Sequence, residues 1–226
     1  MRLHRFFIEE EFKKVSSFTL HDPRLLHQWR NVFRYGVGDS MILFDGSGDD
    51  YVCEIISLDK KEAELKITEK KKGIVPDREV WLFFSLIKKD NVEMILQKCT
   101  ELGVSHFVPI ISERSAPAQT FSAEKLRRAR KILIEASEQC GRSSLPELSD
   151  VMSLEKAIEN YHSKISFLAF DPSGTEFNVL RSTLNVPGLI IGPEGGFAEN
   201  EINLFNAAAG QYVQYRGCPW NNRRSP

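Results

Sequence analysis

The spacing of apolar and polar residues divides the chain near residue 73, and the first part has the pattern of short strands. Residues 40–57 contain two apolar segments around a turn rich in Asp, Gly and Ser, which predicts a β-hairpin. Residues 62–68 alternate between polar and apolar side chains, as a half-buried strand does. Residues 23–34 carry apolar side chains at helical spacing. Together these elements predict a small β-barrel over residues 1–72.

After a charged linker that Gly73 and Pro76 interrupt, longer apolar runs alternate with amphipathic helical patterns. The run Val80–Ile87 is almost continuously apolar, which is typical of a strand covered on both faces. Further strands are expected at 106–111, 165–170 and 188–191, and helices at 91–102 and 122–139. Strands that alternate with helices predict an α/β domain with a mostly parallel sheet over residues 73–226.

Composition says little about partners but narrows the class of protein. The 226 residues contain 30 Lys and Arg against 31 Asp and Glu, so the net charge of −1 neither indicates nor excludes a nucleic-acid partner. The four cysteines form no C-x-x-C pair and the five histidines are scattered, so no metal site is predicted. The sequence has no signal-peptide pattern and no apolar stretch of the ~20 residues that a membrane span needs, which predicts a cytoplasmic protein with no membrane contact.

A glycine-rich segment, Gly192–Gly196, follows the last predicted strand. In open α/β sheets ligands bind at the carboxyl ends of the strands, and glycines let the backbone approach a ligand closely. The segment is neither G-x-G-x-x-G nor a Walker motif, which disfavours nucleotide phosphate as its ligand. The residues alone leave two interpretations open: a ligand-binding loop, or a tight turn into a helix that begins near Ala198.

Two basic regions are candidates for contact with RNA. Residues 113–142 hold seven Lys or Arg against four Glu, a composition that suits phosphate contacts but is also common on a solvated helix face. Residues 2–7 combine basic and aromatic side chains, which suit RNA bases, while the phenylalanines equally suit the core of a first strand. The candidate RNA-binding residues are Arg2, His4, Arg5, Arg114, Arg127, Arg128, Lys131 and Arg142.

Several segments, in order along the chain, carry a family resemblance. They are Met1–Phe7, Leu43–Gly46, Gln97–Val104, Ser112–Ser115, Glu138–Arg142 with Pro146, and Ile191–Phe197. Each is weak alone, and the segment around Glu138 and Arg142 also suits an ordinary helix end. Their order and spacing from Arg2 to about Phe205 are specific. Together they resemble the RsmE family, the 16S rRNA (uracil-N3)-methyltransferases of the SPOUT superfamily.

The resemblance implies a PUA-like RNA-binding β-barrel over residues 1–72 and a SPOUT methyltransferase domain over residues 73–226, with a parallel sheet and a deep trefoil knot. It implies a homodimer that binds S-adenosyl-L-methionine in the knot region and acts on 16S rRNA in the small ribosomal subunit. The cofactor-binding residues that it implies are Leu168, Ala169, Phe170, Ile191, Gly192, Pro193, Glu194, Gly195 and Gly196.

The implied reaction sets requirements of its own. N3 of uracil is a poor nucleophile until its proton leaves, after which the anion attacks the sulfonium methyl in line. The enzyme must align the two reactants, and an arginine is suited to stabilise the uracil anion. Arg142 or Arg114 is the candidate for this role, and Glu138 or Glu194 is the candidate proton acceptor.

Residues 206–226 depart from the family pattern. The family continues with a strand and a segment resembling Leu-Gly-x-Arg-Ile-Leu-Arg-x-Glu-Thr-Ala, and nothing in residues 206–226 matches it. Residues 217–226 are polar and basic with two prolines, which predicts a disordered tail. The departure predicts weakened cofactor binding and a disturbed dimer. It supports a second hypothesis, a catalytically impaired remnant or RNA-binding protein. A third hypothesis is a SPOUT-type methylase with another RNA target.

Overall fold

The computed structural model describes residues 3–10, 12, 16–87, 89–115, 122–176, 186–208 and 211–214. The chain forms two units, each with its own internal contacts. The first unit consists of Met1–Pro76 and Leu133–Leu145, and the second of Asp77–Ile132 and Pro146–Pro226.

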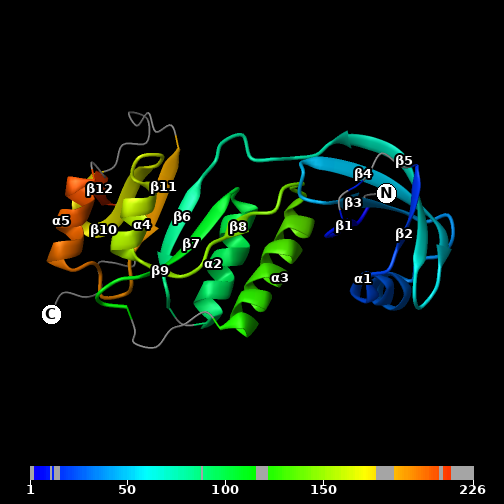
Figure 1. The fold of residues 1–226 in the computed structure, drawn as a ribbon, viewed down its shortest axis with the longest axis horizontal. Coiled ribbons are helices and arrows are strands. Elements are labelled where there is room, and N and C mark those ends of the chain that lie inside the picture. The colour runs from blue at the N-terminus through cyan, green and yellow to red at the C-terminus, as the bar shows by residue number, and fades with distance from the viewer. Residues whose placement is uncertain are drawn as a thin grey trace. The chain divides into compact units, whose positions relative to one another are not determined.

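A five-stranded sheet forms the framework of the first unit (Figure 1). Its strands are β1 (Arg5–Phe7), β2 (Ser17–Leu20), β3 (Ser40–Phe44), β4 (Asp49–Leu58) and β5 (Ala63–Lys72), in the order β1-β3-β4-β5-β2. β3 and β4 form the predicted hairpin, and Gly46 and Gly48 in its turn have φ angles of 87° and 92°, where glycine is favoured. The strand predicted at 62–68 is confirmed within β5.

The helix predicted in the first unit is confirmed as two consecutive segments, α1 (Pro23–His27) and η1 (Gln28–Phe33). Asp22 starts α1 because its carboxylate accepts hydrogen bonds from two backbone N–H groups of the first turn. The second segment has π-helical hydrogen bonding, which the apolar spacing did not predict. Trp29, on η1, is fully buried in the core that lies between these helices and the sheet.

Seven strands form the sheet of the second unit, and every pairing between them is parallel (Figure 1). They are β6 (Trp81–Ser85), β7 (His106–Ile111), β8 (Glu147–Leu148), β9 (Met152–Ser153), β10 (Ser166–Glu176), β11 (Pro187–Ile191) and β12 (Gln211–Gln214). The order is β12-β10-β11-β6-β7-β8. β8 pairs with the start of β7, and β9 pairs with its end. Because the strands are parallel, their carboxyl ends meet at one edge of the sheet.

Among the described residues, α2 (Lys89–Glu101), α4 (Leu154–Tyr161) and α5 (Glu199–Ala207) belong to this unit, and α3 (Ala123–Cys140) belongs to it as far as Ile132. The four predicted strands and two predicted helices are confirmed with boundary shifts. Phe83, Val108, Ala169 and Ile190 come from four neighbouring strands and are buried together in one core. This core explains the long apolar runs, since a parallel sheet that is covered on both faces has no solvent-facing side.

The carboxyl-terminal segment contains a strand that the sequence pattern did not predict. Gln211–Gln214 forms β12 and lies parallel to β10, with Val213 opposite Phe170 and only 3% exposed. The prediction that residues 206–226 lack the family's last strand is therefore wrong for these four residues. Burial of Val213 against the sheet edge gives the segment its strand structure. The tail predicted at 217–226 lies outside the described residues, as do residues 177–185, so the implied knot stays a prediction.

Candidate functional site

The glycine-rich loop after β11 is shaped by contacts that only glycine allows. A Cβ atom on Gly192 would lie 2.8 Å from the ring of Phe197, which is buried and packs edge-to-face on Phe205. Gly196 has a φ angle of 70°, and its N–H donates a 2.9 Å hydrogen bond to the carbonyl of Pro193. The segment is thus a tight turn, and its glycines keep the backbone close to the underlying aromatic ring.

Arg114 joins this loop to the neighbouring loop after β7. Its guanidinium donates a 2.9 Å hydrogen bond to the backbone carbonyl of Gly195. Glu194, one residue earlier, is exposed. The structure therefore brings two candidate catalytic residues, Arg114 and Glu194, onto adjoining loops at the carboxyl edge of the sheet.

A buried carboxylate, which the sequence did not single out, holds the same two loops together. Glu201 is 4% exposed and lies in the first turn of α5. One carboxylate oxygen accepts the N–H of Ala198 at 2.8 Å, and the other accepts the N–H of Glu113 at 2.9 Å. Glutamate at the third position of a helix is a known capping residue, but Ala198 replaces the usual Ser or Thr and weakens that signal. Glu201 thereby holds the backbone of Glu113, which precedes Arg114, and the backbone of Ala198, which follows Phe197.

Serine hydroxyls stabilise the ends of β6 and β7. Ser112 and Ser115 have their Oγ atoms 2.9 Å apart, and the Ser112 N–H donates to the Ser115 Oγ at 3.0 Å. The Oγ of Ser85 lies 3.4 Å from that of Ser112, and both residues are buried. The Ser112–Ser115 motif therefore forms a closed turn, which presents Arg114 from a fixed backbone.

The predicted cofactor wall has one exposed apolar surface. Ile191, at the end of β11, is 41% exposed, whereas Leu168 and Ala169 of β10 are buried and support the wall from within the sheet. Phe170 is half-buried on the same strand. Apolar surface beside glycine backbone is the combination of dispersion contacts and peptide hydrogen-bonding groups that small-molecule sites use. Binding of S-adenosyl-L-methionine by these residues stays a prediction.

The other two candidate catalytic residues, Glu138 and Arg142, lie in the first unit. Glu138 accepts the N–H of Phe7 at 2.9 Å, and burial raises the pKa of its carboxyl above the usual value. Arg142 is 5% exposed, and its guanidinium donates to the Ser144 Oγ at 3.2 Å. Burial lowers the pKa of this guanidinium. Both side chains therefore have packing partners in the first unit.

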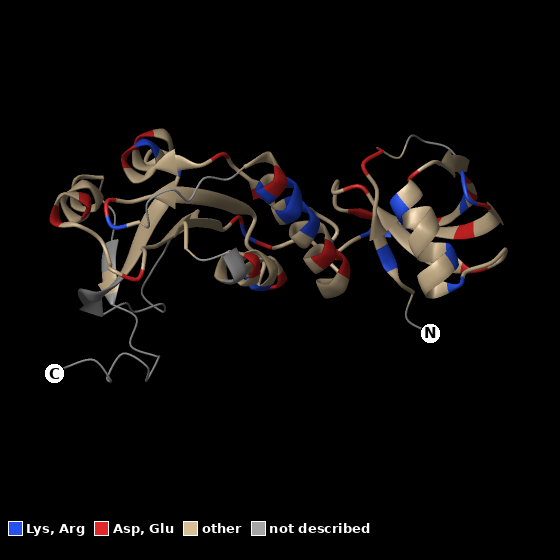
Figure 2. Ribbon diagram, turned by 90° about the horizontal axis from the view of Figure 1, so that it is seen from below, with Lys and Arg blue, Asp and Glu red and all other residues tan. Residues whose placement is uncertain are grey.

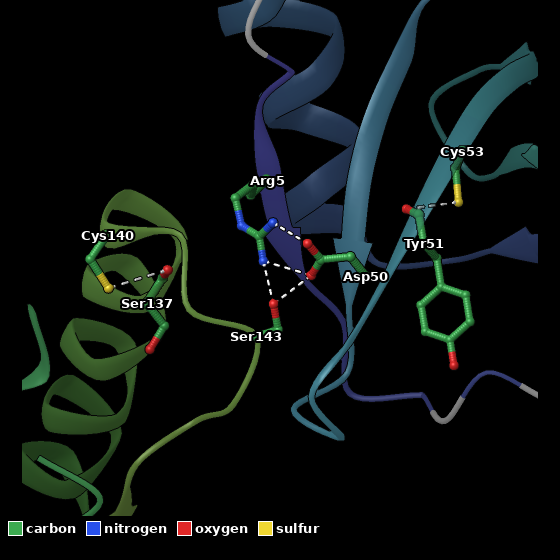
Figure 3. A network of polar contacts seen from close by, with 7 residues as sticks. All are labelled: Arg5, Asp50, Tyr51, Cys53, Ser137, Cys140 and Ser143. Carbon is green, nitrogen blue, oxygen red and sulfur yellow. Dashed lines mark hydrogen bonds and ion pairs between the residues drawn. The ribbon is translucent and has the colours of Figure 1, made fainter. Parts of the chain in front are cut away.

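A buried ion pair links β1, β4 and the segment after α3 (Figure 3). Arg5 donates to both carboxylate oxygens of Asp50, at 2.6 and 2.8 Å, and also to Ser143 at 2.8 Å. Burial alone would raise the pKa of Asp50, but the hydrogen bonds from Arg5 and Ser143 outweigh it and hold that pKa below its usual value. A Cβ atom on Gly73 would overlap the Ser143 side chain, so the close approach of these two residues requires glycine at position 73.

The candidate RNA-binding residues have different surroundings. The exposed side chains of α3 include Arg127, Arg128 and Lys131, and Figure 2 shows blue segments along this helix. Arg128 also forms a 2.8 Å ion pair with Glu93 of α2. The guanidinium of Arg5 forms an ion pair with Asp50. Arg2 lies outside the described residues.

His4 contacts the aromatic ring system of the first unit. Its Nδ1 lies 2.7 Å from the Tyr35 hydroxyl, and its ring centroid is 4.4 Å from that of Phe33. This candidate is therefore positioned by aromatic side chains.

Among the described residues, no helix is both long and apolar enough to cross a membrane. The same residues include no group of three or more His, Cys, Asp or Glu side chains arranged to hold a metal ion.

Comparisons with known proteins agree with this architecture. Residues 75–214 match the model of an RNA methyltransferase domain, and residues 30–68 match the model of an RNA methyltransferase PUA domain. The first match extends past Phe205 and includes β12. The chain thus has the two domains of an RNA methyltransferase with a PUA domain.

Individual relatives narrow this class. The ribosomal RNA small subunit methyltransferase E of Helicobacter pylori is 34% identical over 164 residues, which cover 69% of this chain and 67% of the relative. The Bacillus subtilis protein of the same name is 28% identical, with 88% and 84% covered. The crystal structure of the Neisseria gonorrhoeae protein of that name, bound to S-adenosyl methionine, is 27% identical with a TM-score of 0.84, and covers 95% of this chain and 89% of that one. The chain belongs to the ribosomal RNA small subunit methyltransferase E family, for which RsmE is the short name.

Proposed function

We propose that this chain transfers a methyl group from S-adenosyl-L-methionine to N3 of one uridine in the 16S rRNA of the small ribosomal subunit. Membership in the RsmE family supports the reaction class. The observation that carries the proposal is the contact of Arg114 with the carbonyl of Gly195, because it places a cation on the loop that would hold the methyl donor.

The donor would be held by the edge of the second unit. Ile191 offers apolar surface to the adenine ring, and the Gly192–Gly196 backbone offers peptide groups for hydrogen bonds. When bound, S-adenosyl-L-methionine supplies an electrophilic methyl group on a sulfonium centre. Glu201 keeps the two loops at this edge in register.

The residues of the chain would then act on the uracil. Arg114 stabilises the negative charge that develops on the ring as the N3 proton leaves, and Glu194 accepts that proton. The N3 lone pair forms the new bond to the methyl carbon while the sulfonium keeps the electrons of the bond that breaks. The roles predicted for Arg142 and Glu138 stay predictions, which substitution of each residue tests.

The RNA would be held by the first unit and by the exposed basic side chains of α3. Arg127, Arg128 and Lys131 suit contacts with phosphates, which position an RNA without reading its sequence. A homodimer in the cytoplasm, as the family resemblance implies, belongs to the same proposal.

Mass spectrometry of 16S rRNA from a strain that lacks this chain tests the function. We expect one N3-methyluridine to disappear and to return when the unmodified chain is restored, but not with Arg114→Ala. An unchanged modification map would reject the proposal, and loss of a methyl group elsewhere would reassign the target.

One observation favours a second function, RNA binding without methyl transfer. The family match ends at residue 214, and the sequence after Gln214 contains none of the last family motif. In this case calorimetry would detect no binding of S-adenosyl-L-methionine to the purified chain, whereas affinity in the micromolar range would reject it.

A further inference from the structure

Three serine hydroxyls form a chain at the carboxyl edge of the sheet in the second unit, beside the residue Arg114. Ser85 is the last residue of β6, Ser112 directly follows β7, and Ser115 closes the turn after it. The Oγ of Ser85 lies 3.4 Å from that of Ser112, which in turn lies 2.9 Å from that of Ser115. None of the roles proposed for the methyl transfer involves these hydroxyls.

The burial of two of these serines fixes the direction in which the chain donates. A hydroxyl can donate one hydrogen bond and accept two, so the distances alone leave the direction open. Ser85 and Ser112 are 2% and 5% exposed, and in the part of the chain that the structure describes their Oγ atoms form no hydrogen bond outside the three serines. If Ser115 donated to Ser112, the proton of Ser85 or of Ser112 would be buried without an acceptor, which is costly. Ser85 therefore donates to Ser112, and Ser112 donates to Ser115.

Ser115 consequently presents a donor and no acceptor. Its Oγ accepts the backbone N–H of Ser112 at 3.0 Å as well as the Ser112 hydroxyl, so both of its lone pairs are used. Its own proton has no use within the chain of hydroxyls, and the residue is partly exposed. A serine on a surface can usually either donate or accept, whereas Ser115 can only donate.

The turn that holds this donor adjoins the glycine-rich loop. Ser115 directly follows Arg114, whose guanidinium donates a 2.9 Å hydrogen bond to the carbonyl of Gly195. The N–H of Ser115 donates to the carbonyl of Ser112 at 3.0 Å, so backbone and side chains together close the turn. A donor on a closed turn keeps its direction, and a group that discriminates between similar substrates needs this rigidity.

Methylation at N3 creates a need for such a donor. N3 of cytosine has a lone pair and no proton, so it is a readier nucleophile than N3 of uracil. A site that only aligned N3 with the methyl donor would therefore methylate cytosine in preference to uracil. The two bases differ at position 4, where uracil has an acceptor oxygen and cytosine has an amino donor. A group that can only donate pairs with the first and opposes the second.

We propose that Ser115 selects uracil at the target position by donating a hydrogen bond to O4. The same bond stabilises the uracil anion, because the charge that forms at N3 spreads onto O4. Cytosine would direct its amino group at the Ser115 proton, and neither donor would have an acceptor. The inference rests on the proposed function, since it takes N3 of uridine as the methylated atom.

Methylation of two matched substrates tests the selection. Small ribosomal subunits are assembled with 16S rRNA transcripts that carry either uridine or cytidine at the position that the unmodified chain methylates. The value of kcat/KM is measured for each. We expect the unmodified chain to prefer uridine by about 1,000-fold or more, since a site that hydrogen-bonds one group rejects an analogue that cannot pair. The ratio of the two kcat/KM values is the readout, because a damaged turn lowers both values and leaves their ratio unchanged.

Two variants change the donor in different ways. Ser115→Ala removes it, so uridine methylation should fall about tenfold and the preference for uridine about 100-fold. Ser112→Ala keeps the Ser115 hydroxyl but frees one of its lone pairs, which lets it accept from a cytosine amino group. In this variant uridine methylation should stay within about threefold and cytidine methylation should rise about tenfold or more. Ser105→Ala is the matched control, since this serine precedes β7 at the opposite edge of the sheet, and its preference should equal that of the unmodified chain.

The outcomes separate this inference from the proposed function. If the unmodified chain methylates N3 of uridine and Ser115→Ala or Ser112→Ala keeps its preference, selection by Ser115 is overturned and the proposed function stands. Equal methylation of cytidine and uridine by the unmodified chain, or an equal loss of preference in Ser105→Ala, would also overturn the selection alone. If the unmodified chain methylates no uridine, both proposals are overturned.

Discussion

The guanidinium of Arg114 donates a 2.9 Å hydrogen bond to the carbonyl oxygen of Gly195. This bond joins the loop after β7 to the loop after β11, although β6 separates these strands in the sheet. It explains how the Ser112–Ser115 motif and the glycine-rich motif, distant in sequence, lie next to each other in the structure.

The first prediction concerns this bond. Arg114→Ala removes both the contact with Gly195 and the cation proposed for the uracil anion, so we expect kcat/KM to fall by about 100-fold or more. The exposed position predicts a change in unfolding free energy within about 0.5 kcal/mol. Steady-state methylation and thermal melting measure the two effects. Arg78→Ala, at another exposed arginine of the second unit, serves as the control, and equal activity of the two variants would contradict the role.

The second prediction concerns Glu201. Glu201→Ala leaves the N–H groups of Ala198 and Glu113 without their acceptor, which should cost about 2 kcal/mol of unfolding free energy. Glu201→Gln keeps one acceptor oxygen and should cost about half as much. Because the loops lose their common anchor, the Kd for S-adenosyl-L-methionine should rise several-fold in both variants.

Chemical denaturation and calorimetry make these measurements. Glu199→Ala, an exposed glutamate in the same helical turn, should cost less than about 1 kcal/mol and leave the Kd unchanged. Full donor affinity in Glu201→Ala would show that this carboxylate does not position the site.

The third prediction is a pH dependence from Glu138. Burial raises the pKa of this carboxyl in the folded chain, so the folded state binds more protons than the unfolded state between the unfolded pKa, roughly 4.3, and the raised value. The contribution to stability therefore falls as pH rises through that interval. Glu138→Gln does not titrate but keeps an oxygen for the Phe7 N–H.

Urea denaturation over a pH series checks this sign. The variant should gain stability relative to the unmodified chain as pH rises, and the gain should level off above the raised pKa. Identical pH profiles of stability for Glu138→Gln and the unmodified chain would contradict the raised pKa of Glu138. Methylation by the same variant tests whether Glu138 also accepts the proton.

The fourth prediction concerns the buried pair in Figure 3. Arg5→Met leaves the Asp50 carboxylate without its cation and should cost about 3 kcal/mol, as should Asp50→Leu. The double variant should recover much of this loss, because two apolar side chains leave no buried charge. Additive losses in the double-mutant cycle would refute the coupling. Lys71, which lies opposite Asp50 on β5, is exposed, so Lys71→Ala serves as the control and should have a small effect on stability.

The parts of the fold that the sequence predicted are those with a strong local pattern. Trp81–Ser85 and Pro187–Ile191 are largely apolar because both faces of the sheet are covered, and this run is visible without knowing the partner strand. Glu147–Leu148 and Met152–Ser153 are two-residue strands that form only because β7 offers its edge, so no local pattern marks them.

The site was predictable where chemistry follows a motif, and less so where it depends on distant partners. Gly192–Gly196 and Arg114 were found from sequence, but their bond could not be. From the sequence, Arg5 is a candidate RNA contact. The structure shows that its guanidinium donates to the carboxylate of Asp50, 45 residues away. The π-helical turn before Arg34 has the same apolar spacing as an ordinary helix, so the sequence pattern could not predict it.

The central claim is tested most directly by methylation in vitro. The purified chain is incubated with small ribosomal subunits that lack the modification and with S-adenosyl-L-methionine carrying a deuterated methyl group. Nucleosides from the digested 16S rRNA are then separated and identified by mass spectrometry. The account predicts labelled N3-methyluridine at a single position. Absence of label, or label on another atom or nucleoside, would contradict it.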